Sequence, residues 1–490
     1  MQKRAVLILL VVALLLSSLT GCYKKVKIDS PDILEETSEE AAGDLSSGNE
    51  SLETGGEGMS ETSSQDYQGS SQATSNASPD KKDQTSAADP DVSGEPPVEN
   101  GGSRFEKFRD HNSYGAKIIS LLNTYWYSDS QGQKMKDNPF KSNTPVTLWG
   151  YGAYLEALGS YLEANPNSSV AYSFYLRTLE GLAMYKDRRK SNETQLAYHC
   201  WADPNGYSEV FFDDNVWVLL ELIHAHDIFK ARGENDKAQK YLTMAEQISV
   251  YILNEGWDEK LGGGLYWEDK TTCGDDVNHP PMKGTCINAP MAYAATQLYK
   301  LTNKPHYKEW AVKIYKWTVE KLYSESDNLF HDKILIEPGG NRLDPTKYTY
   351  NVGNMILAAA GLYEITNDTR YLNDAKKYAE GAFNKFIHKW NRQGEAAYAW
   401  TSAVPWFNSS LIKGYIKLYN IDKDPKVADY LVAVRTSLAT ACLIAADKDG
   451  FINGDWRSDR IDADQKQLLV QAGTARSLFM IHIWTKNSGK

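Results

Sequence analysis

From residue 105 onward, apolar residues mostly recur every three or four positions, which is the spacing of one buried face of an α-helix. The segment "VWVLLELIHAHDIF", residues 216–229, is a clear example. Short clusters of Gly, Pro, Asn and Asp interrupt the pattern and mark turns between successive helices. The chain is therefore predicted to fold as an all-α protein over residues 104–490.

Three of the predicted helices resemble one another. Their sequences are "KYLTMAEQISVYI", "HYKEWAVKIYKWTV" and "RYLNDAKKYAEGAF", and each has a Tyr followed four residues later by Ala. The tyrosines, Tyr241, Tyr307 and Tyr371, are 66 and 64 residues apart. Two of these segments also follow a similar lead-in, "LYKLTNKP" and "LYEITNDT", which is typical of a helix end and a short turn. The sequence thus repeats with a period of about 65 residues.

A period of this length accommodates two helices and their connections, so each repeat is predicted to be one helical hairpin. Residues 105–490 amount to 386 residues, close to six such units. Six hairpins favour a closed (α/α)6 toroid, because closure removes the exposed ends that an open solenoid must cap. An open helical solenoid is the alternative. In a toroid, one set of helix ends and the longer loops should converge on a central cleft.

The N-terminal segment has the organisation of an export signal. Residues 1–22 contain a basic start, a short apolar run and small residues before Cys22. The ending "LTGC" resembles a bacterial lipobox, which implies a lipid on Cys22 and attachment to the outer face of the bacterial cell membrane. An uncleaved signal anchor is the alternative. Residues 23–103 are then predicted to be a disordered linker, because they are rich in Ser, Gly, Glu, Asp and Thr.

Charge is distributed very unevenly along the chain. Residues 29–103 contain 18 acidic and 2 basic residues, whereas residues 104–490 contain 46 of each sign. A neutral globular domain argues against nucleic acid as a partner and suits an uncharged substrate. All 13 tryptophans lie in this domain and provide flat apolar faces on which sugars can stack.

The cysteines give little indication of a metal or a disulfide framework. Besides Cys22, the chain has Cys200, Cys273, Cys286 and Cys442, and only Cys273 and Cys286 lie close enough in sequence to suggest a bond, which the sequence leaves open. No motif with the spacing of a zinc site is present, so neither a metal nor another cofactor is expected.

Asp213 and Asp214 are the most informative polar residues. They stand between two phenylalanines and a long apolar helix, where two neighbouring carboxylates are costly to desolvate. The simpler interpretation is a helix start, with an Asp N-cap and an acidic first turn. At a junction between loop and helix, however, two neighbouring carboxylates can flank one glycosidic bond, as glycoside cleavage requires.

Four further motifs are weak when each is taken alone. "GWDEKLGGGLYW" ends in Trp267 after three glycines that permit a close approach of backbone to a ligand. "KGTCINAP" has Asn288 at a helix start, "LFHDKI" places Asp332 between apolar neighbours, and "YTYNVG" puts Tyr350 and Asn351 before another apolar helix. A flexible turn with core aromatics explains the first motif as well as a ligand site does, and for Asn288 alone a helix cap is the better explanation.

Their order along the chain, however, resembles glycoside hydrolase family 76, the α-1,6-mannanase family, across roughly residues 145–385. The resemblance implies an (α/α)6 barrel that cleaves α-1,6-mannosidic bonds within mannan, with retention and without a metal. It places Asp213 at the nucleophile and Asp214 at the acid/base. It also places six residues at or near substrate-binding positions: Trp149, Trp267, Asn288, Asp332, Tyr350 and Asn351.

Residues 268–282 depart from the family pattern because they are longer than the expected connection. They are either a lid or subsite wall, or a pendant loop without a role. Beyond Gly381 the resemblance becomes weaker, and only "AYAWTSAVPWFNSSLI", residues 397–412, is typical of sequence that lines a cleft.

The sequence therefore predicts a monomeric, lipid-anchored, endo-acting α-1,6-mannanase with the domain order signal (1–22), linker (23–103) and catalytic toroid (104–490). A transglycosylase using the same site is one alternative. A carbohydrate-binding lipoprotein is a second, although a pure binder has no use for two clustered carboxylates. A toroidal lyase or glucuronyl hydrolase is a third, which the neutral charge of the domain does not support.

Overall fold

The computed structural model describes residues 102–128, 134–203, 207–273, 280–392 and 394–490, which belong to one compact unit. The predicted signal and the predicted linker lie outside these residues, apart from Gly102 and Ser103. Most of the described chain is helical, and its short strands form small antiparallel sheets within the connections.

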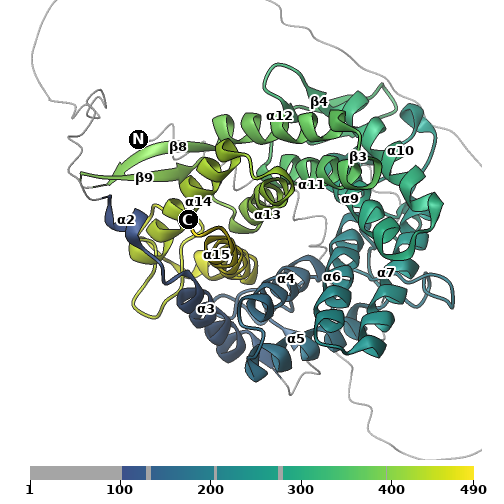
Figure 1. The fold of residues 1–490 in the computed structure, drawn as a ribbon. Coiled ribbons are helices and arrows are strands. Elements are labelled where there is room, and N and C mark those ends of the chain that lie inside the picture. The colour runs from purple at the N-terminus through teal and green to yellow at the C-terminus, as the bar shows by residue number, and fades with distance from the viewer. Residues whose placement is uncertain (1–101, 129–133, 204–206, 274–279, 393) are drawn as a thin grey trace, which may run out of the picture. The chain divides into compact units, whose positions relative to one another are not determined.

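Six helices form an inner ring (Figure 1). They are α4 (Leu148–Ala164), α6 (Phe212–Ala231), α9 (Thr285–Thr302), α11 (Thr349–Thr366), α13 (Pro405–Asp422) and α15 (Leu468–Ser488). Each packs against the next in this order, and α15 packs against α4, so the ring is closed. The predicted (α/α)6 toroid is confirmed, and the open solenoid is wrong.

Six further helices surround the ring. They are α3 (His111–Tyr125), α5 (Ser169–Gly181), α7 (Asn235–Gly256), α10 (Pro305–Leu322), α12 (Thr369–Phe386) and α14 (Pro425–Leu443). Five of them pack on the inner helix that precedes them, whereas α3 packs on α15. The structure therefore has five consecutive hairpins and a sixth made from the first and last long helices of the domain.

The repeated sequence motif marks equivalent points of the outer helices. Each repeated Tyr lies in the N-terminal half of α7, α10 or α12, and the Ala four residues later is fully buried. The turns before α10 and α12 begin with a residue of positive φ, Asn303 after α9 and Asn367 after α11. Lys423 after α13 repeats this geometry, in a third copy of the lead-in that the sequence analysis missed.

The connections differ sharply between the two ends of the ring. The inner helices lead to the outer helices through short turns, at 165–168, 232–234, 303–304, 367–368 and 423–424. The return connections are long, and they hold all the strands of the described residues: β1 (Tyr127–Ser128), β2 (Lys134–Met135), β3 (Met282–Gly284), β4 (Tyr323–Ser324), β5 (Leu329–Phe330), β6 (Lys333–Leu335), β7 (Arg342–Asp344), β8 (Ile387–Arg392) and β9 (Glu395–Trp400). The elaborated end is therefore the one where the inner helices begin.

Burial explains why the inner helices lack the one-sided polarity of the outer ones. An inner helix has neighbours on both sides as well as an outer helix behind it, so most of its residues are buried. Where α11 packs on α13, a Cβ on Gly353 would lie 2.7 Å from the backbone of Leu411. Only glycine fits there. None of the helices in the described ranges combines the length and apolarity needed to cross a membrane.

The packing contact between α3 and α15, here called the α3–α15 seam, allows a prediction about stability. A Cβ on Gly115 of α3 would lie 2.8 Å from the ring of Phe479 on α15, and this ring is itself buried and stacked on Tyr161. Gly115→Ala is expected to lower the free energy of unfolding by about 1–3 kcal/mol, as overpacking does. Gly152→Ala is the matched control, because a Cβ there meets nothing within 4 Å. It is expected to gain about 0.5–1 kcal/mol from helix propensity.

Urea unfolding of the 104–490 fragment, followed by circular dichroism, measures both changes. Equal effects of the two substitutions on the unfolding midpoint would show that the α3–α15 seam is not closely packed in solution.

Candidate active site

The predicted site residues gather at the elaborated end of the ring. Six of them lie in the first turns of inner helices: Trp149 on α4, Asp213 and Asp214 on α6, Asn288 on α9, and Tyr350 and Asn351 on α11. Trp267 and Asp332 lie in the long connections that lead into α9 and α11. Residues that are spread over about 200 positions of the sequence therefore share one structural position, at or just before the start of an inner helix.

Asp213 and Asp214 lie in the first turn of α6, which begins at Phe212. Phe211 is the N-cap and makes no side-chain cap bond, so the expected Asp N-cap is wrong. Asn215 fixes this junction instead: its side chain bonds both the N–H and the carbonyl of Tyr198, and also the Phe211 carbonyl. The two aspartates are thus left partly exposed on a firmly held backbone.

Both carboxylate oxygens of Asp213 accept a hydrogen bond. Oδ1 accepts from the backbone N–H of Asp214 at 2.9 Å, and Oδ2 accepts from Nε1 of Trp267 at 2.8 Å. Burial raises the pKa of Asp213 to about 7, even though the bonds from Trp267 and Asp214 lower it in part. A carboxyl group with such a pKa can exist in either protonation state near neutral pH.

Trp267 reaches Asp213 because their two segments pair as antiparallel backbone. Phe211 forms a bridge with Glu268, and the Phe212 N–H donates to the Trp267 carbonyl at 2.8 Å. The half-buried Trp267 ring packs on Phe211, with the ring centroids 4.6 Å apart. The indole N–H therefore orients a carboxylate, and stacking of Trp267 on a sugar stays a prediction.

Asn288 supports the same loop from beneath. Its Oδ1 accepts from the Leu265 N–H at 2.8 Å, and its Nδ2 donates to the carbonyls of Leu265 and Gly284. The side chain is fully buried, so in this conformation it holds the backbone two residues before Trp267. A direct contact between Asn288 and a substrate stays a prediction.

A third carboxylate, Asp332, lies beside the pair. Its Oδ1 accepts from Nδ2 of Asn351 at 2.9 Å, and Nζ of Lys333 lies 3.2 Å from its Oδ2. Burial raises the pKa of Asp332, while Lys333 lowers it in part. Between Asp332 and Asp213 lies Cys286, a buried free thiol whose pKa is raised by burial and by both carboxylates. Because Cys286 is free, the bond to Cys273 that the sequence left open is absent.

Aromatic rings from three inner helices form a second part of the site. Trp149 packs edge-on against Trp406 with centroids 5.3 Å apart, and Tyr350 lies 4.2 Å from Phe407. Trp149 and Phe407 are nearly parallel, at 20°. The sequence analysis singled out residues 397–412 as cleft-lining but did not select Trp406 or Phe407, because nothing local indicates that α13 begins beside α4.

Buried charges hold this aromatic cluster from below. The indole N–H of Trp406 donates to Oε2 of Glu156 at 2.7 Å, and Arg476 pairs with the same oxygen at 2.8 Å. On the neighbouring helix, burial alone would raise the pKa of Glu221, but His224 and further cations outweigh it and hold the pKa at about 2. His224 lies between Glu163 and Glu221, which raise its pKa to about 10 against the effect of burial.

The described residues contain no group of His, Cys, Asp and Glu side chains suited to a metal ion. The site offers carboxylate chemistry: a pair of adjacent acids, one of them with a raised pKa, beside flat aromatic faces. The long connection 268–282 contributes at both ends, because residues 267–269 pair with 210–212 and β3 pairs with β6. Its middle, 274–279, lies outside the described residues, so its role as a lid stays a prediction.

The sequence model of glycosyl hydrolase family 76 matches residues 112–481, which is most of the domain and extends well beyond the residues where the motifs were evident. Among curated proteins, the chain is similar to the mannan endo-1,6-alpha-mannosidase DCW1 of Saccharomyces cerevisiae, with 25% identity over 36% of this chain and 38% of that protein. The matches with curated relatives span about half of those proteins or less.

Two solved structures show the same fold. One is a family 76 mannosidase from Bacteroides thetaiotaomicron, with a TM-score of 0.67 and 23% identity over 78% of this chain and 100% of that chain. The other is an α-1,6-mannanase from Salegentibacter sp. HEL1_6, with a TM-score of 0.57 and 19% identity over 76% of this chain and 100% of that chain. The latter is an inactive variant in which two consecutive aspartates are replaced by asparagines, in complex with α-1,6-mannotriose.

Proposed function

Because this chain belongs to glycosyl hydrolase family 76, we propose that it is an endo-acting α-1,6-mannanase that retains the configuration of the cleaved bond. The observation that carries the proposal is the pair Asp213–Asp214 at the start of α6, with the Asp213 carboxylate held by the Trp267 indole N–H. Support also comes from the Salegentibacter mannanase, whose inactive variant has two consecutive aspartates replaced.

In the proposed mechanism, Asp213 attacks the anomeric carbon while Asp214 donates a proton to the departing glycosidic oxygen. The bond between this carbon and oxygen breaks, and a mannosyl ester of Asp213 forms. Asp214, now a carboxylate, takes a proton from water, and the resulting hydroxide displaces Asp213. A retaining site needs its carboxyl groups only about 5–5.5 Å apart, which suits neighbouring residues, whereas inversion needs about 6.5–9.5 Å.

The remaining predicted residues have proposed roles around this pair. Trp149, with Tyr350 from α11, provides aromatic surface for a mannose ring. Asp332 is proposed to accept hydrogen bonds from sugar hydroxyls, with Asn351 orienting it. Asn288 supports the loop of Trp267, which also contributes to binding. No step of this mechanism uses a metal or another cofactor.

Digestion of linear α-1,6-mannan by the 104–490 fragment tests the proposed activity. Early products of mixed length are expected, because an endo enzyme cuts within the chain. Mannose as the sole product from the start would contradict endo action. Binding without any cleavage would favour the carbohydrate-binding alternative. A mannan transglycosylase would instead give longer products when oligosaccharide acceptors are added.

The division of labour between the two acids is separately testable. Asp214→Ala is expected to keep cleaving a mannoside with an already acidic leaving group, because no proton donation is needed, and azide should rescue its second step. Asp213→Ala should lose turnover on activated and natural substrates alike. In the wild type, kcat/KM should fall as the pH drops through about 7, since the nucleophile must be ionised.

Three outcomes would contradict this assignment. If Asp213 donated the proton instead, kcat/KM would fall as the pH rises through about 7. If the first product carried the β configuration in a proton NMR spectrum, the reaction would invert. Near-normal activity per folded molecule in both variants would leave the pair only a structural role in the helix start.

We also propose that the protein is exported and anchored by a lipid on Cys22, which lies outside the described residues. The acidic segment between Cys22 and the toroid, with a reach of about 50 Å for a flexible chain of its length, would lift the site clear of the lipid headgroups. Expressed in a bacterial host fed radiolabelled palmitate, the full chain should carry label and sediment with membranes, whereas Cys22→Ser should do neither. Equal membrane association of the variant without label would favour the signal anchor.

A further inference from the structure

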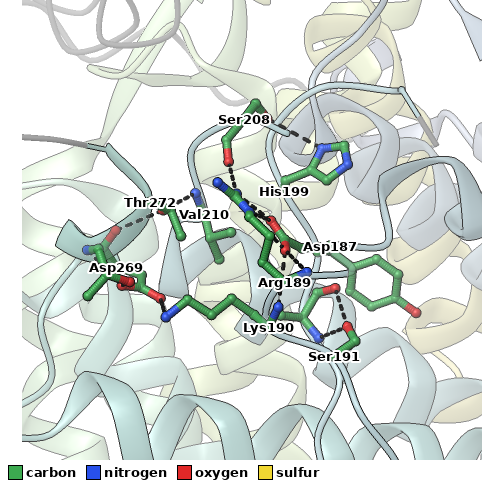
Figure 2. A network of polar contacts seen from close by, with 12 residues as sticks. Asp187, Arg189, Lys190, Ser191, His199, Ser208, Val210, Asp269 and Thr272 are labelled. Atoms are coloured by element: carbon green, nitrogen blue, oxygen red, sulfur yellow. Dashed lines mark hydrogen bonds and ion pairs between the residues drawn. The ribbon is translucent and has the colours of Figure 1, made fainter. Parts of the chain in front are cut away.

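A turn at residues 187–191, between α5 and α6, holds the two backbone segments on which the proposed nucleophile depends (Figure 2). Its foundation is Asp187, a fully buried carboxylate. Asp187 accepts from the backbone N–H groups of Arg189 and Lys190, and its two oxygens also accept from the Arg189 guanidinium. The turn is therefore rigid, and the side chains of Arg189 and Lys190 leave it from a fixed backbone.

Arg189 holds the segment that leads into α6. Its Nη2 donates to the Ser208 carbonyl at 2.6 Å, and the Ser208 hydroxyl lies 3.3 Å from Nδ1 of His199. This segment runs directly on through Val210 to Asp213. The position of the α6 start therefore depends partly on Arg189.

Lys190, the next residue, holds the segment that follows Trp267. Its Nζ lies 2.9 Å from Oδ2 of Asp269, and the Tyr251 hydroxyl donates to the same oxygen at 2.8 Å. The Lys190 side chain is 19% exposed and that of Asp269 only 4%, so water and salt screen this ion pair weakly. Glu255 lies farther from Lys190, at 3.9 Å.

The two segments held in this way are the ones that pair with each other. The Asp269 N–H donates to the Val210 carbonyl at 2.9 Å, and the Val210 N–H donates to Oγ1 of Thr272 at 3.0 Å. Two residues farther along the pairing, the Phe212 N–H donates to the Trp267 carbonyl. Asn288 fixes Leu265 on the N-terminal side of Trp267. On the C-terminal side, Lys190 supplies the cationic partner of Asp269, in addition to the hydrogen bonds from Tyr251 and Thr271.

We propose that Lys190 is a positioning residue of the active site: by holding Asp269, it keeps the Trp267 indole N–H on the Asp213 carboxylate. The proposal rests on the mannanase function proposed above. Trp267 lies two residues from Asp269, and its loop begins with Gly262, Gly263 and Gly264, all of positive φ, which add no side-chain anchor of their own. Loss of the Lys190–Asp269 ion pair is thus expected to loosen the hydrogen bond from Trp267 to Asp213, although no group in contact with Asp213 is removed.

The expected consequence is a change in the ionisation of Asp213. A donor on a carboxylate stabilises the charged form, so its loss raises the pKa and moves the acidic limb of kcat/KM to higher pH. Other titratable or charged groups face Asp213 from the neighbouring elements, and every variant below retains them: Asp214 on α6, Cys286 on α9, Asp332 and Lys333 before and in β6, and Tyr350 on α11.

The test compares Lys190→Met with Trp267→Phe, which removes the indole donor itself. Trp267→Phe is expected to move the acidic limb upward by about one pH unit, and Lys190→Met should move it in the same direction by up to that amount. The double variant should match Trp267→Phe alone, because both changes act through one hydrogen bond. Lys190→Arg, which retains the positive charge, should restore the wild-type profile.

Lys237→Met is the matched control. Lys237 pairs with Glu234 at 2.5 Å in the turn after α6, at the opposite end of that helix from Asp213. The Lys237→Met substitution is expected to change the stability at most and to leave the pH profile of kcat/KM unchanged. If Lys190→Met likewise lowers only the melting temperature, or if its shift adds fully to that of Trp267→Phe, the proposed positioning role is wrong.

A second readout does not require activity. In protein labelled with ¹⁵N at the tryptophan indoles, the Trp267 signal, assigned from its loss in Trp267→Phe, should shift with pH as Asp213 ionises. In the Lys190→Met variant, the midpoint of this titration of the Trp267 signal should shift, or the titration should be lost. A wild type that shows this titration but cleaves no mannan would refute the proposed function alone. An unchanged titration in Lys190→Met would refute the positioning role alone.

Discussion

Closure of the inner ring is the constraint on which the rest of this structure depends. An inner helix is apolar on most of its surface, so it needs an inner neighbour on each side and an outer helix behind it. An open arrangement would leave two such helices exposed at its ends. The contact of α15 with α4, and of α3 with α15, removes both exposed surfaces. The first and last long helices of the domain therefore complete each other.

Closure also determines where the chemistry is located. Five inner helices are each followed by a short turn and an outer helix, and the sixth, α15, follows the outer helix α14 through a long connection. All six inner helices therefore begin at the same end of the ring, where the long connections also lie. The first turns of helices have free N–H groups and a partial positive charge, which favour carboxylates. Asp213 at the start of α6 is in this environment, and Asp332 lies beside the starts of α9 and α11. A residue needs only to precede or begin an inner helix to take part in the site.

Two polar networks then convert this arrangement into a defined geometry. The pair Glu156–Arg476 fixes the Trp406 ring inside the barrel, where a charge is tolerated because each partner compensates the other. The turn around Asp187 fixes the segments that contain Asp213 and Trp267. In both cases an indole N–H is bonded to a carboxylate, which sets the ring orientation at no cost in unsatisfied polar groups.

Much of this could be predicted from the sequence because it depends on local patterns. Helical periodicity and the repeated tyrosines Tyr241, Tyr307 and Tyr371 indicate hairpins, and the chain length gives six of them. The adjacent Asp213 and Asp214 need no folding to be recognised as a candidate pair. Turn chemistry is equally local, as the left-handed Asn303 and Asn367 show.

Contacts between distant segments were decided only by the tertiary structure. The α3–α15 hairpin joins helices more than 300 residues apart, and no periodicity along the chain specifies it. The bond from Trp267 to Asp213 spans 54 residues and depends on the pairing of two loop segments. The burial of Asn288, the free thiol of Cys286 and the place of Trp406 in the site have the same origin. Local sequence determines which face of a helix is apolar, whereas the packing of the closed ring determines which side chains that face meets.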